Sequence, residues 1–116
     1  MDLVKLFKAL SDPTRYRIVL LLLERHHCSR SLAHVLGISE PAVSQHMAVL
    51  KDCGLVTGVR RCRHIHYQVN EQLLADALAQ MQGWITKTRV SCDCCGHNRC
   101  AFCTRAPLSH GLEGTP

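Results

Sequence analysis

The strongest constraint on the fold is a change in the spacing of apolar residues near residue 54. Residues 3–53 carry apolar side chains at the three- and four-residue spacing of helices, interrupted by turn signals. Two short segments, Leu55–Val59 and Ile65–Val69, then read as strands. A helical pattern returns after Asn70. We therefore predict a mainly α fold with one small β-hairpin.

Turn signals divide the first helical part into four helices, expected over about residues 3–10, 13–25, 29–36 and 40–53. Ser39 precedes Pro41 and is placed to cap the fourth helix. Gly37 and Gly54 follow helix ends, as left-handed residues commonly do. The second helix carries the run Ile18–Leu23, which is apolar almost all round, so we expect this helix at the buried centre.

The last helix is expected from its cap, Asn70, to about Val90, and the composition changes abruptly beyond it. The helix carries one apolar stripe, made of Leu73, Leu74, Ala77, Leu78, Met81 and Ile85. Residues 91–116 are instead rich in Cys, Gly, His and Arg. We therefore predict a folded domain over residues 1–90 and a cysteine-rich C-terminal tail over residues 91–116.

The basic charge lies in the first part of the chain. The net charge is +5, and residues 1–70 carry ten Lys and Arg against five Asp and Glu, whereas residues 71–116 carry four of each. The longest apolar run, Ile18–Leu23, is too short to cross a bilayer, and Met1–Lys5 lacks the basic start of a signal peptide. We expect a cytoplasmic protein with no membrane partner, a polyanion-binding first part and reduced thiols.

An enzyme is disfavoured. The 116 residues allow one ordinary domain and a tail, without a second domain to close a cleft. No cysteine is followed at the required offset by the arginine of a reductase anion loop. Cys100 and Cys103 have redox spacing but follow a helix, not the strand-to-helix turn of a thioredoxin-like site. A thiol oxidoreductase remains a remote alternative, and we assign no catalytic residue.

The third and fourth helices, separated by a turn at Gly37, form a predicted helix-turn-helix whose second helix would enter the DNA major groove. The positions expected to face DNA there are Ser39, Glu40, Ala42, Ser44, Gln45, His46 and Lys51. Gln45 is suited to pair with adenine. The alternative is that these polar residues are simply the solvated face of an amphipathic helix.

The predicted hairpin favours the DNA-binding interpretation. Arg60, Arg61 and Arg63 crowd its expected tip, where they resemble a phosphate or minor-groove contact. A purely structural hairpin has no reason to gather three arginines there. The hairpin would then be the wing of a winged helix-turn-helix.

Three ordered segments, Ala9–Arg15, Ser39–Leu50 and Gly54–Val56, resemble the ArsR/SmtB family of winged-helix transcriptional repressors that respond to metals and metalloids. The resemblance covers residues 3–90. It implies a homodimer formed through the first and last helices. Such a dimer would bind double-stranded DNA at an inverted-repeat operator.

The resemblance also indicates which familiar ligand sites this chain lacks. Many members carry a Cys-Val-Cys metalloid site in the helix before the reading helix, which is the second helix of the helix-turn-helix. Here Cys28 matches the first cysteine of that site, but Arg30 stands at the second. Other members bind zinc through Asp and His of the last helix, but residues 71–90 contain no histidine. The first site is broken and the second is absent.

The remaining candidate is a cluster of five cysteines within twelve residues: Cys92, Cys94, Cys95, Cys100 and Cys103. Thiolates bind soft ions, so we predict a sensory site for arsenic(III), zinc or cadmium whose filling releases the repressor from DNA. A structural zinc, a redox switch and an iron-sulfur cluster remain alternatives. Cys28, with His26 or His27, is the second choice of ligands.

Overall fold

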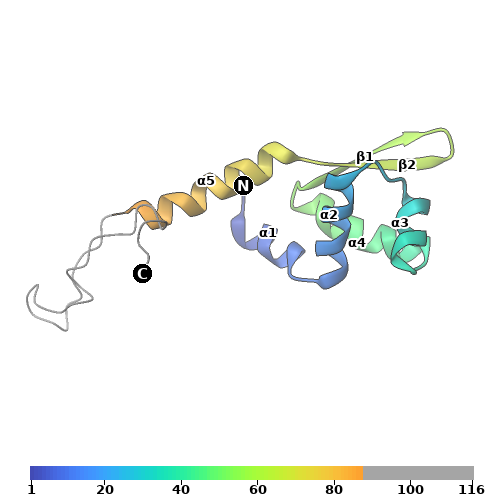
Figure 1. Ribbon diagram of the computed structural model, residues 1–116, viewed down its shortest axis with the longest axis horizontal. Coiled ribbons are helices and arrows are strands. Elements are labelled where there is room, and N and C mark those ends of the chain that lie inside the picture. Colours follow the sequence, from blue (N-terminus) through green and yellow to red (C-terminus); the bar gives the residue numbers. More distant parts are fainter. Residues whose placement is uncertain (88–116) are drawn as a thin grey trace, which may run out of the picture. The chain divides into compact units, whose positions relative to one another are not determined.

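The computed structural model describes residues 1–87 and confirms the predicted fold class. Its elements in that part are α1 (Leu3–Leu10), α2 (Pro13–Glu24), α3 (Ser29–Leu36), α4 (Glu40–Asp52), β1 (Val56–Arg61), β2 (His64–Val69) and α5 (Glu71–Thr86) (Figure 1). Met1–Ala77 form one compact unit, and the chain from Leu78 onward is a second. The predicted domain boundary after residue 90 lies outside the described residues. Within residues 1–87, no helix is long and apolar enough to cross a membrane.

The helices begin where side chains take up their free backbone amides. Ser39 Oγ accepts a hydrogen bond from the Ala42 amide at 3.2 Å, which starts α4 as predicted. Asn70 Oδ1 accepts one from the Leu73 amide at 3.1 Å at the start of α5. Both predicted caps are therefore confirmed.

Two glycines close helices in the left-handed conformation, also as predicted. Gly37 has φ +70° after α3, and Gly54 has φ +83° after α4. The amide of Gly54 donates to the carbonyl of Lys51 at 2.9 Å, and its carbonyl accepts from Asn70 Nδ2 at 3.4 Å. Gly54 thereby turns the chain from α4 toward the hairpin.

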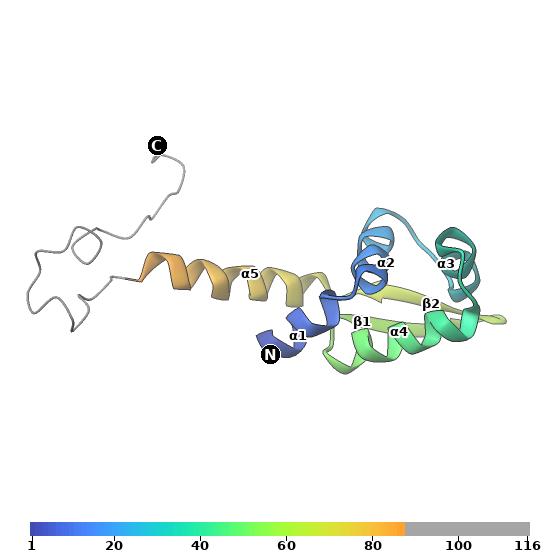
Figure 2. The same ribbon diagram turned by 90° about the horizontal axis from the view of Figure 1, so that it is seen from below.

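The core gathers apolar side chains from every element of the compact unit. α2 and α3 both pack on α4, and the hairpin contacts all three helices, β2 against α2 and α3 and β1 against α4 (Figure 2). α4 contributes Val43, Met47 and Leu50, which recur at helical spacing on one face. The buried apolar residues are Leu6, Ala9, Ile18, Val19, Leu32, Ala33, Val43, Met47, Leu50, Leu55, Val56, Tyr67 and Ala77. This core fixes which side of α4 faces solvent.

α2, expected at the buried centre, is buried on one side only. Ile18 and Val19 are buried, but Leu20 and Leu23 are 47% and 45% exposed. α2 packs against α1, α4 and β2, and these neighbours cover only part of its surface. The run thus supplies core residues on one side and an exposed apolar surface on the other.

The hairpin is longer than predicted. β1 and β2 pair antiparallel from Val56 opposite Val69 to Arg61 opposite His64, which leaves Cys62 and Arg63 as the turn, with Cys62 at φ +58°. The placement of Arg60 and Arg61 in the tip is therefore wrong, because both belong to β1. Cross-strand pairing outweighs their charge, and they occupy the outer end of the strand.

Candidate nucleic-acid interface and thiol groups

The α3–α4 pair has the arrangement of a helix-turn-helix. α3 ends at Gly37, and the Ile38 amide donates back to the Ala33 carbonyl at 3.1 Å before α4 begins. Because α4 buries one face in the core, the opposite face is free to approach a ligand. Among the predicted DNA-facing positions, Ser39, Glu40, Ser44, Gln45 and Lys51 are exposed, whereas Ala42 and His46 are half-buried.

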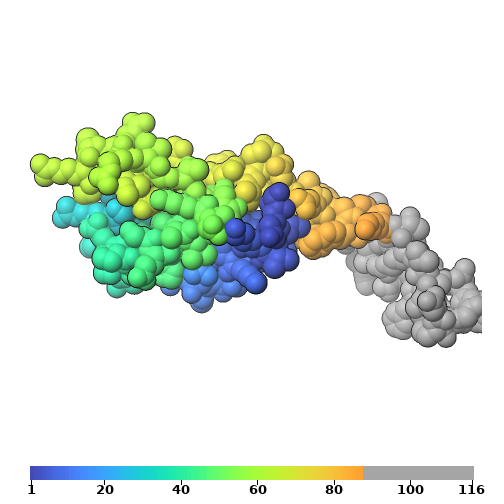
Figure 3. Space-filling view, turned by 180° about the vertical axis from the view of Figure 1, so that it is seen from behind, coloured from blue at the N-terminus to red at the C-terminus, as the bar shows by residue number. Residues whose placement is uncertain are grey.

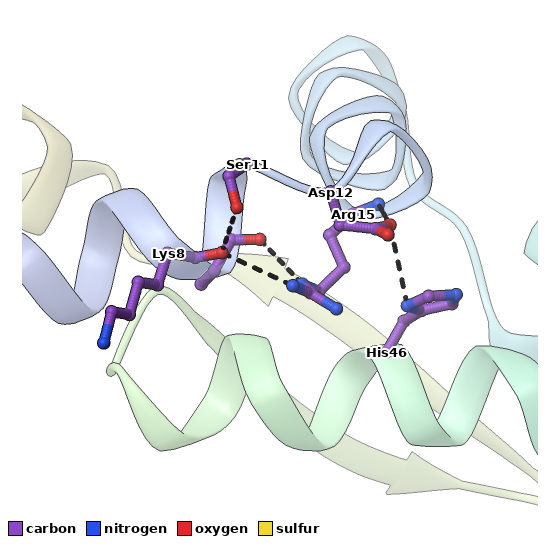
Figure 4. A network of polar contacts seen from close by, with 6 residues as sticks. Lys8, Ser11, Asp12, Arg15 and His46 are labelled. Carbon is purple, nitrogen blue, oxygen red and sulfur yellow. Dashed lines mark hydrogen bonds and ion pairs between the residues drawn. The ribbon is translucent and has the colours of Figure 1, made fainter.

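His46 is turned toward the start of α2. Its Nδ1 lies 3.9 Å from Asp12 Oδ2, and the same oxygen accepts the Arg15 amide at 3.0 Å (Figure 4). The hydrogen bond from the Arg15 amide is the main cause that lowers the pKa of Asp12, with further help from the charges of Arg15 and His46. His46 therefore connects the reading helix to the N-terminus of α2, a contact that sequence reasoning missed.

Arg15 fastens the end of α1 to α2. Its guanidinium donates to the carbonyls of Ala9 at 2.7 Å and of Lys8 at 3.4 Å (Figure 4). These are carbonyls at a helix end, which lack partners within the helix. Since Asp12 caps the start of α2 and Arg15 lies in its first turn, one short segment contacts both α1 and α4.

The other end of α4 is joined directly to α1. Lys5 Nζ lies 3.0 Å from Asp52 Oδ2, and this hydrogen-bonded ion pair raises the pKa of Lys5. Both side chains are well exposed, so the pair contributes little to stability. It nevertheless gives α1 a contact at the C-terminal end of the reading helix.

Exposed basic side chains lie on the hairpin, whose first strand contacts α4. Arg60, Arg61 and Arg63 of the hairpin are all exposed. Lys51 Nζ stands 5.4 Å from the centre of the Tyr67 ring, between α4 and the hairpin. In the space-filling view the hairpin adjoins α4 (Figure 3). The two neighbouring elements together carry exposed hydrogen-bonding groups and four exposed cations, groups that suit a phosphate backbone.

The predicted thiol cluster cannot be placed, because Cys92, Cys94, Cys95, Cys100 and Cys103 lie outside the described residues. Within residues 1–87, Cys28 and Cys53 are half-buried free thiols and Cys62 is an exposed one. In this part, no three side chains of His, Cys, Asp or Glu lie close enough together to hold a metal ion as they stand. With Arg30 at the second family position, the described residues do not fit a three-ligand metalloid site.

Cys28 nevertheless has a specific structural role, as the cap of α3. Its Sγ accepts the Ser31 amide at 3.4 Å, and the Ser31 hydroxyl accepts the Cys28 amide at 3.1 Å. Burial raises the pKa of this thiol, but hydrogen bonds from Ser31 and from the Arg30 amide outweigh burial, so the net pKa is lowered. The thiolate, the form that binds soft ions, is therefore easier to form here than at an ordinary cysteine.

A cavity of about 550 Å³ opens beside Cys28. Its lining residues are His26, His27, Cys28, Ser31, Val59, Arg61, His66 and Gln68. His66 comes from β2, where it pairs with Cys28 in an isolated antiparallel bridge. The sequence does not connect His66 with Cys28, because only the packing of the hairpin against the α2–α3 connection brings them together.

A helix-turn-helix, an adjoining basic hairpin and an exposed polar face on the second helix define a winged-helix DNA-binding protein. Residues 12–57 match the family model described as bacterial regulatory protein, arsR family. The chain belongs to this family, as its sequence motifs predicted. It is a DNA-binding transcriptional regulator and not an enzyme.

Three known proteins illustrate the relationship. The chain is 32% identical over 91 residues to a probable mercury resistance operon repressor of Streptomyces lividans, covering 78% of this chain and 73% of that protein. It is 38% identical over 79 residues to the transcriptional regulator CmtR of Mycobacterium tuberculosis, covering 68% of this chain and 67% of CmtR. The solved structure of an ArsR-like transcriptional regulator from Rhodococcus matches with a TM-score of 0.63 and 34% identity. The match covers 69% of this chain and 73% of the Rhodococcus chain.

Proposed function

We propose that this chain is a cytoplasmic, homodimeric repressor that binds an inverted-repeat operator and leaves it when a soft metal or metalloid ion is bound by the thiols of its tail. The observation that carries the DNA-binding part is the exposed face of α4 beside the basic hairpin. Family membership supports repression, since the related proteins include resistance-operon repressors.

The proposed interface would make two kinds of contact with DNA, one to base edges and one to phosphates. Ser44 and Gln45 on α4 supply hydrogen-bonding groups for base edges, with Glu40 and Ala42 nearer the start of the helix. Lys51 and the three hairpin arginines supply charge for phosphates. His46 would reach DNA only by turning away from Asp12, so we rank it below Gln45 as a base contact.

Exposed apolar side chains support a dimer. α1 leaves Val4 and Phe7 exposed, and α5 leaves Leu78, Trp84 and Ile85 exposed. Surfaces of this kind mark protein contacts when they are contiguous. A two-fold dimer would present two reading helices about one DNA turn apart, which predicts the inverted repeat.

The proposed sensor is the tail cluster, with Cys94, Cys95 and Cys100 as the first choice for arsenic(III), and with Cys92 or Cys103 completing a four-ligand site for zinc or cadmium. Its support is the soft character of clustered thiolates and the broken or absent family sites elsewhere. A coupling of about 1–3 kcal/mol would change operator affinity about 5- to 150-fold.

The DNA-binding part is tested by footprinting and by two substitutions with opposite signatures. Gln45→Ala should relax preference at one base pair by about 1–3 kcal/mol. Arg61→Ala should weaken all sequences alike and lower the salt slope by about 1 for each lost phosphate contact. Arg17→Ala, at an exposed arginine of α2, is the matched control and should change neither. A chain that protects no inverted repeat contradicts the proposal.

The sensory part is tested by changing Cys94, Cys95 and Cys100 together to Ser. The variant should remain a folded dimer that stays on its operator when arsenite is added. Normal release would transfer the role to Cys28 with His26 or His27. Loss of folding would favour a structural zinc, and colour after anaerobic purification would favour an iron-sulfur cluster.

A further inference from the structure

A buried histidine with an unpartnered ring nitrogen lines the cavity beside α3. His27 is only 7% exposed, and its Nε2 has no hydrogen-bond partner among the described residues. The other ring nitrogen, Nδ1, lies 3.0 Å from Ser31 Oγ. Buried polar atoms in native proteins almost always have a partner, so Nε2 needs an explanation. A ligand held in the cavity would supply the missing partner.

The hydrogen bonds around Ser31 indicate whether that nitrogen is a donor or an acceptor. The Ser31 hydroxyl has one hydrogen, which it can donate to His27 Nδ1 at 3.0 Å or to the Cys28 carbonyl at 3.2 Å. That carbonyl already accepts the Leu32 amide at 3.0 Å. The hydroxyl hydrogen is therefore better used on Nδ1, and the neutral ring then carries its own hydrogen on Nε2. The unpartnered Nε2 is a donor that needs an acceptor.

The rest of the lining favours an acceptor with one negative charge. Arg61 of β1 brings a permanent positive charge and a planar fork of N–H donors, which suits a carboxylate. None of the lining residues, all of which belong to the described part of the chain, is an aspartate or glutamate. Cys28 and Ser31 bring the first turn of α3 to the cavity, and the N-terminal end of a helix favours an anion. A monoanion balances the arginine, whereas a phosphate dianion would leave a negative charge unpaired.

The size and walls of the cavity indicate an organic body on that carboxylate. Its volume of about 550 Å³ lies within the roughly 300–1,000 Å³ typical of small-molecule sites. Val59 and Arg61 are two residues apart on β1, so both project to the same face of the hairpin, and His66 opposes Val59 on β2. The ring of His26 stands edge-on to that of His66 at 6.3 Å between centroids. An apolar side chain and flat rings are walls that pack well against another aromatic ring.

We propose that this cavity binds a small aromatic monocarboxylate. The carboxylate accepts hydrogen bonds from the Arg61 guanidinium and from His27 Nε2, and the aromatic ring packs between Val59 and the His66 imidazole. The site uses no thiol, is separate from the tail cysteines and goes beyond the function proposed above. A bound carboxylate would hold Arg61 in the cavity and withdraw one of the proposed phosphate contacts. That consequence rests on the proposed DNA interface, whereas binding of the carboxylate does not.

The test is a titration of the full, metal-free chain with benzoate in the absence of DNA, followed by NMR of the histidine and arginine side chains. One benzoate per chain should bind, with saturable shifts in the signals of His27, Arg61 and His66. The signals of His34, an exposed histidine outside the cavity, should stay in place. Benzamide has the same shape without the charge and should bind at least about 10-fold more weakly. The absence of a saturable shift at His27 would overturn the proposal.

Two exposed arginines of β1 give a matched pair of variants. Arg61→Ala should weaken benzoate binding at least about 10-fold. Arg60→Ala removes the same charge from the neighbouring position, whose side chain projects to the opposite face of the hairpin, and should leave binding unchanged. An equal loss in both variants would show attraction to positive charge alone and would overturn the proposal.

The protonation of His27 and the charge of the ligand are tested separately. Long-range nitrogen NMR should show the hydrogen of His27 on Nε2; a hydrogen on Nδ1 alone would overturn the argument for an acceptor. Phenyl phosphate should bind more weakly than benzoate, and equal or tighter binding would overturn the choice of a monocarboxylate. Operator binding by the ligand-free chain is measured independently, so failure of this site and failure of the proposed function are distinguishable.

Discussion

Replacing Gly54 by Ala tests how the reading helix is joined to the hairpin. Gly54 has φ +83°, a conformation that costs an L-residue roughly 1–2 kcal/mol. A new Cβ would also lie 3.3 Å from Leu73 Cδ1, the flexible end of a side chain that can give way. We therefore expect the backbone cost to dominate, with a contact cost below the roughly 1 kcal/mol of mild overpacking.

Two other glycines separate these contributions. Gly37 has φ +70° but open space around its Cβ position, so Gly37→Ala should show the backbone cost alone. Gly83, inside α5, has neither a positive φ nor a close neighbour, so Gly83→Ala should stabilise by about 0.5–1 kcal/mol. The difference between the first two variants then measures the Leu73 contact.

The assay is thermal and urea unfolding at one fixed protein concentration, because the stability of a dimer depends on concentration. For a domain of this size, 1 kcal/mol corresponds to about 4–8 °C in Tm. Gly37→Ala should therefore lower Tm by about 4–16 °C, and Gly54→Ala by at least as much. If both variants had the same Tm as the unaltered chain, the conclusion that left-handed glycines are needed to close α3 and α4 would be refuted.

Three further predictions concern stability. Burial lowers the pKa of His27, so the unfolded chain binds the proton more readily. The contribution of His27 to the free energy of unfolding should be constant above about pH 6.5 and fall as the pH drops through that value, in urea titrations between about pH 5 and 7 that His27→Gln flattens. Ser39→Ala should cost about 0.5–2 kcal/mol by removing the α4 cap, whereas Ser44→Ala, exposed on the same helix, should be nearly neutral in the same unfolding measurement. Gly58→Ala places a Cβ 3.2 Å from the buried Tyr67 ring and should cost about 1–3 kcal/mol; an unchanged urea midpoint would show that the ring moves aside freely.

Features set by local chemistry were predictable from the sequence. Ser39, Gly37 and Gly54 act through hydrogen bonds and dihedral angles within a few residues, so their patterns identified the helix ends. The exposed face of α4 followed from helical periodicity for the same reason.

Features set by tertiary packing were not predictable in the same way. The exposure of Leu20 depends on how much of α2 its neighbours cover, and the strand conformation of Arg61 depends on its partner His64. The candidate cavity depends on a contact between segments distant in the chain, Cys28 and His66. No local pattern encodes such contacts, which is why the sequence indicated Cys28 but gave no reason to join His66 to it.

The root of the hairpin is held on both sides, and this has a mechanical consequence. The Tyr67 amide donates to the His27 carbonyl at 3.4 Å, and the Asn70 amide donates to the Leu55 carbonyl at 2.7 Å. At the outer end, Arg61 pairs with His64 across the turn formed by Cys62 and Arg63. The hairpin is therefore fixed at its base by hydrogen bonds to the rest of the domain, and we expect its outer end to move more easily. Its amides should exchange with solvent progressively faster toward the tip, and the arginines proposed to bind phosphates would then follow DNA backbones of differing groove width while α4 stays in place.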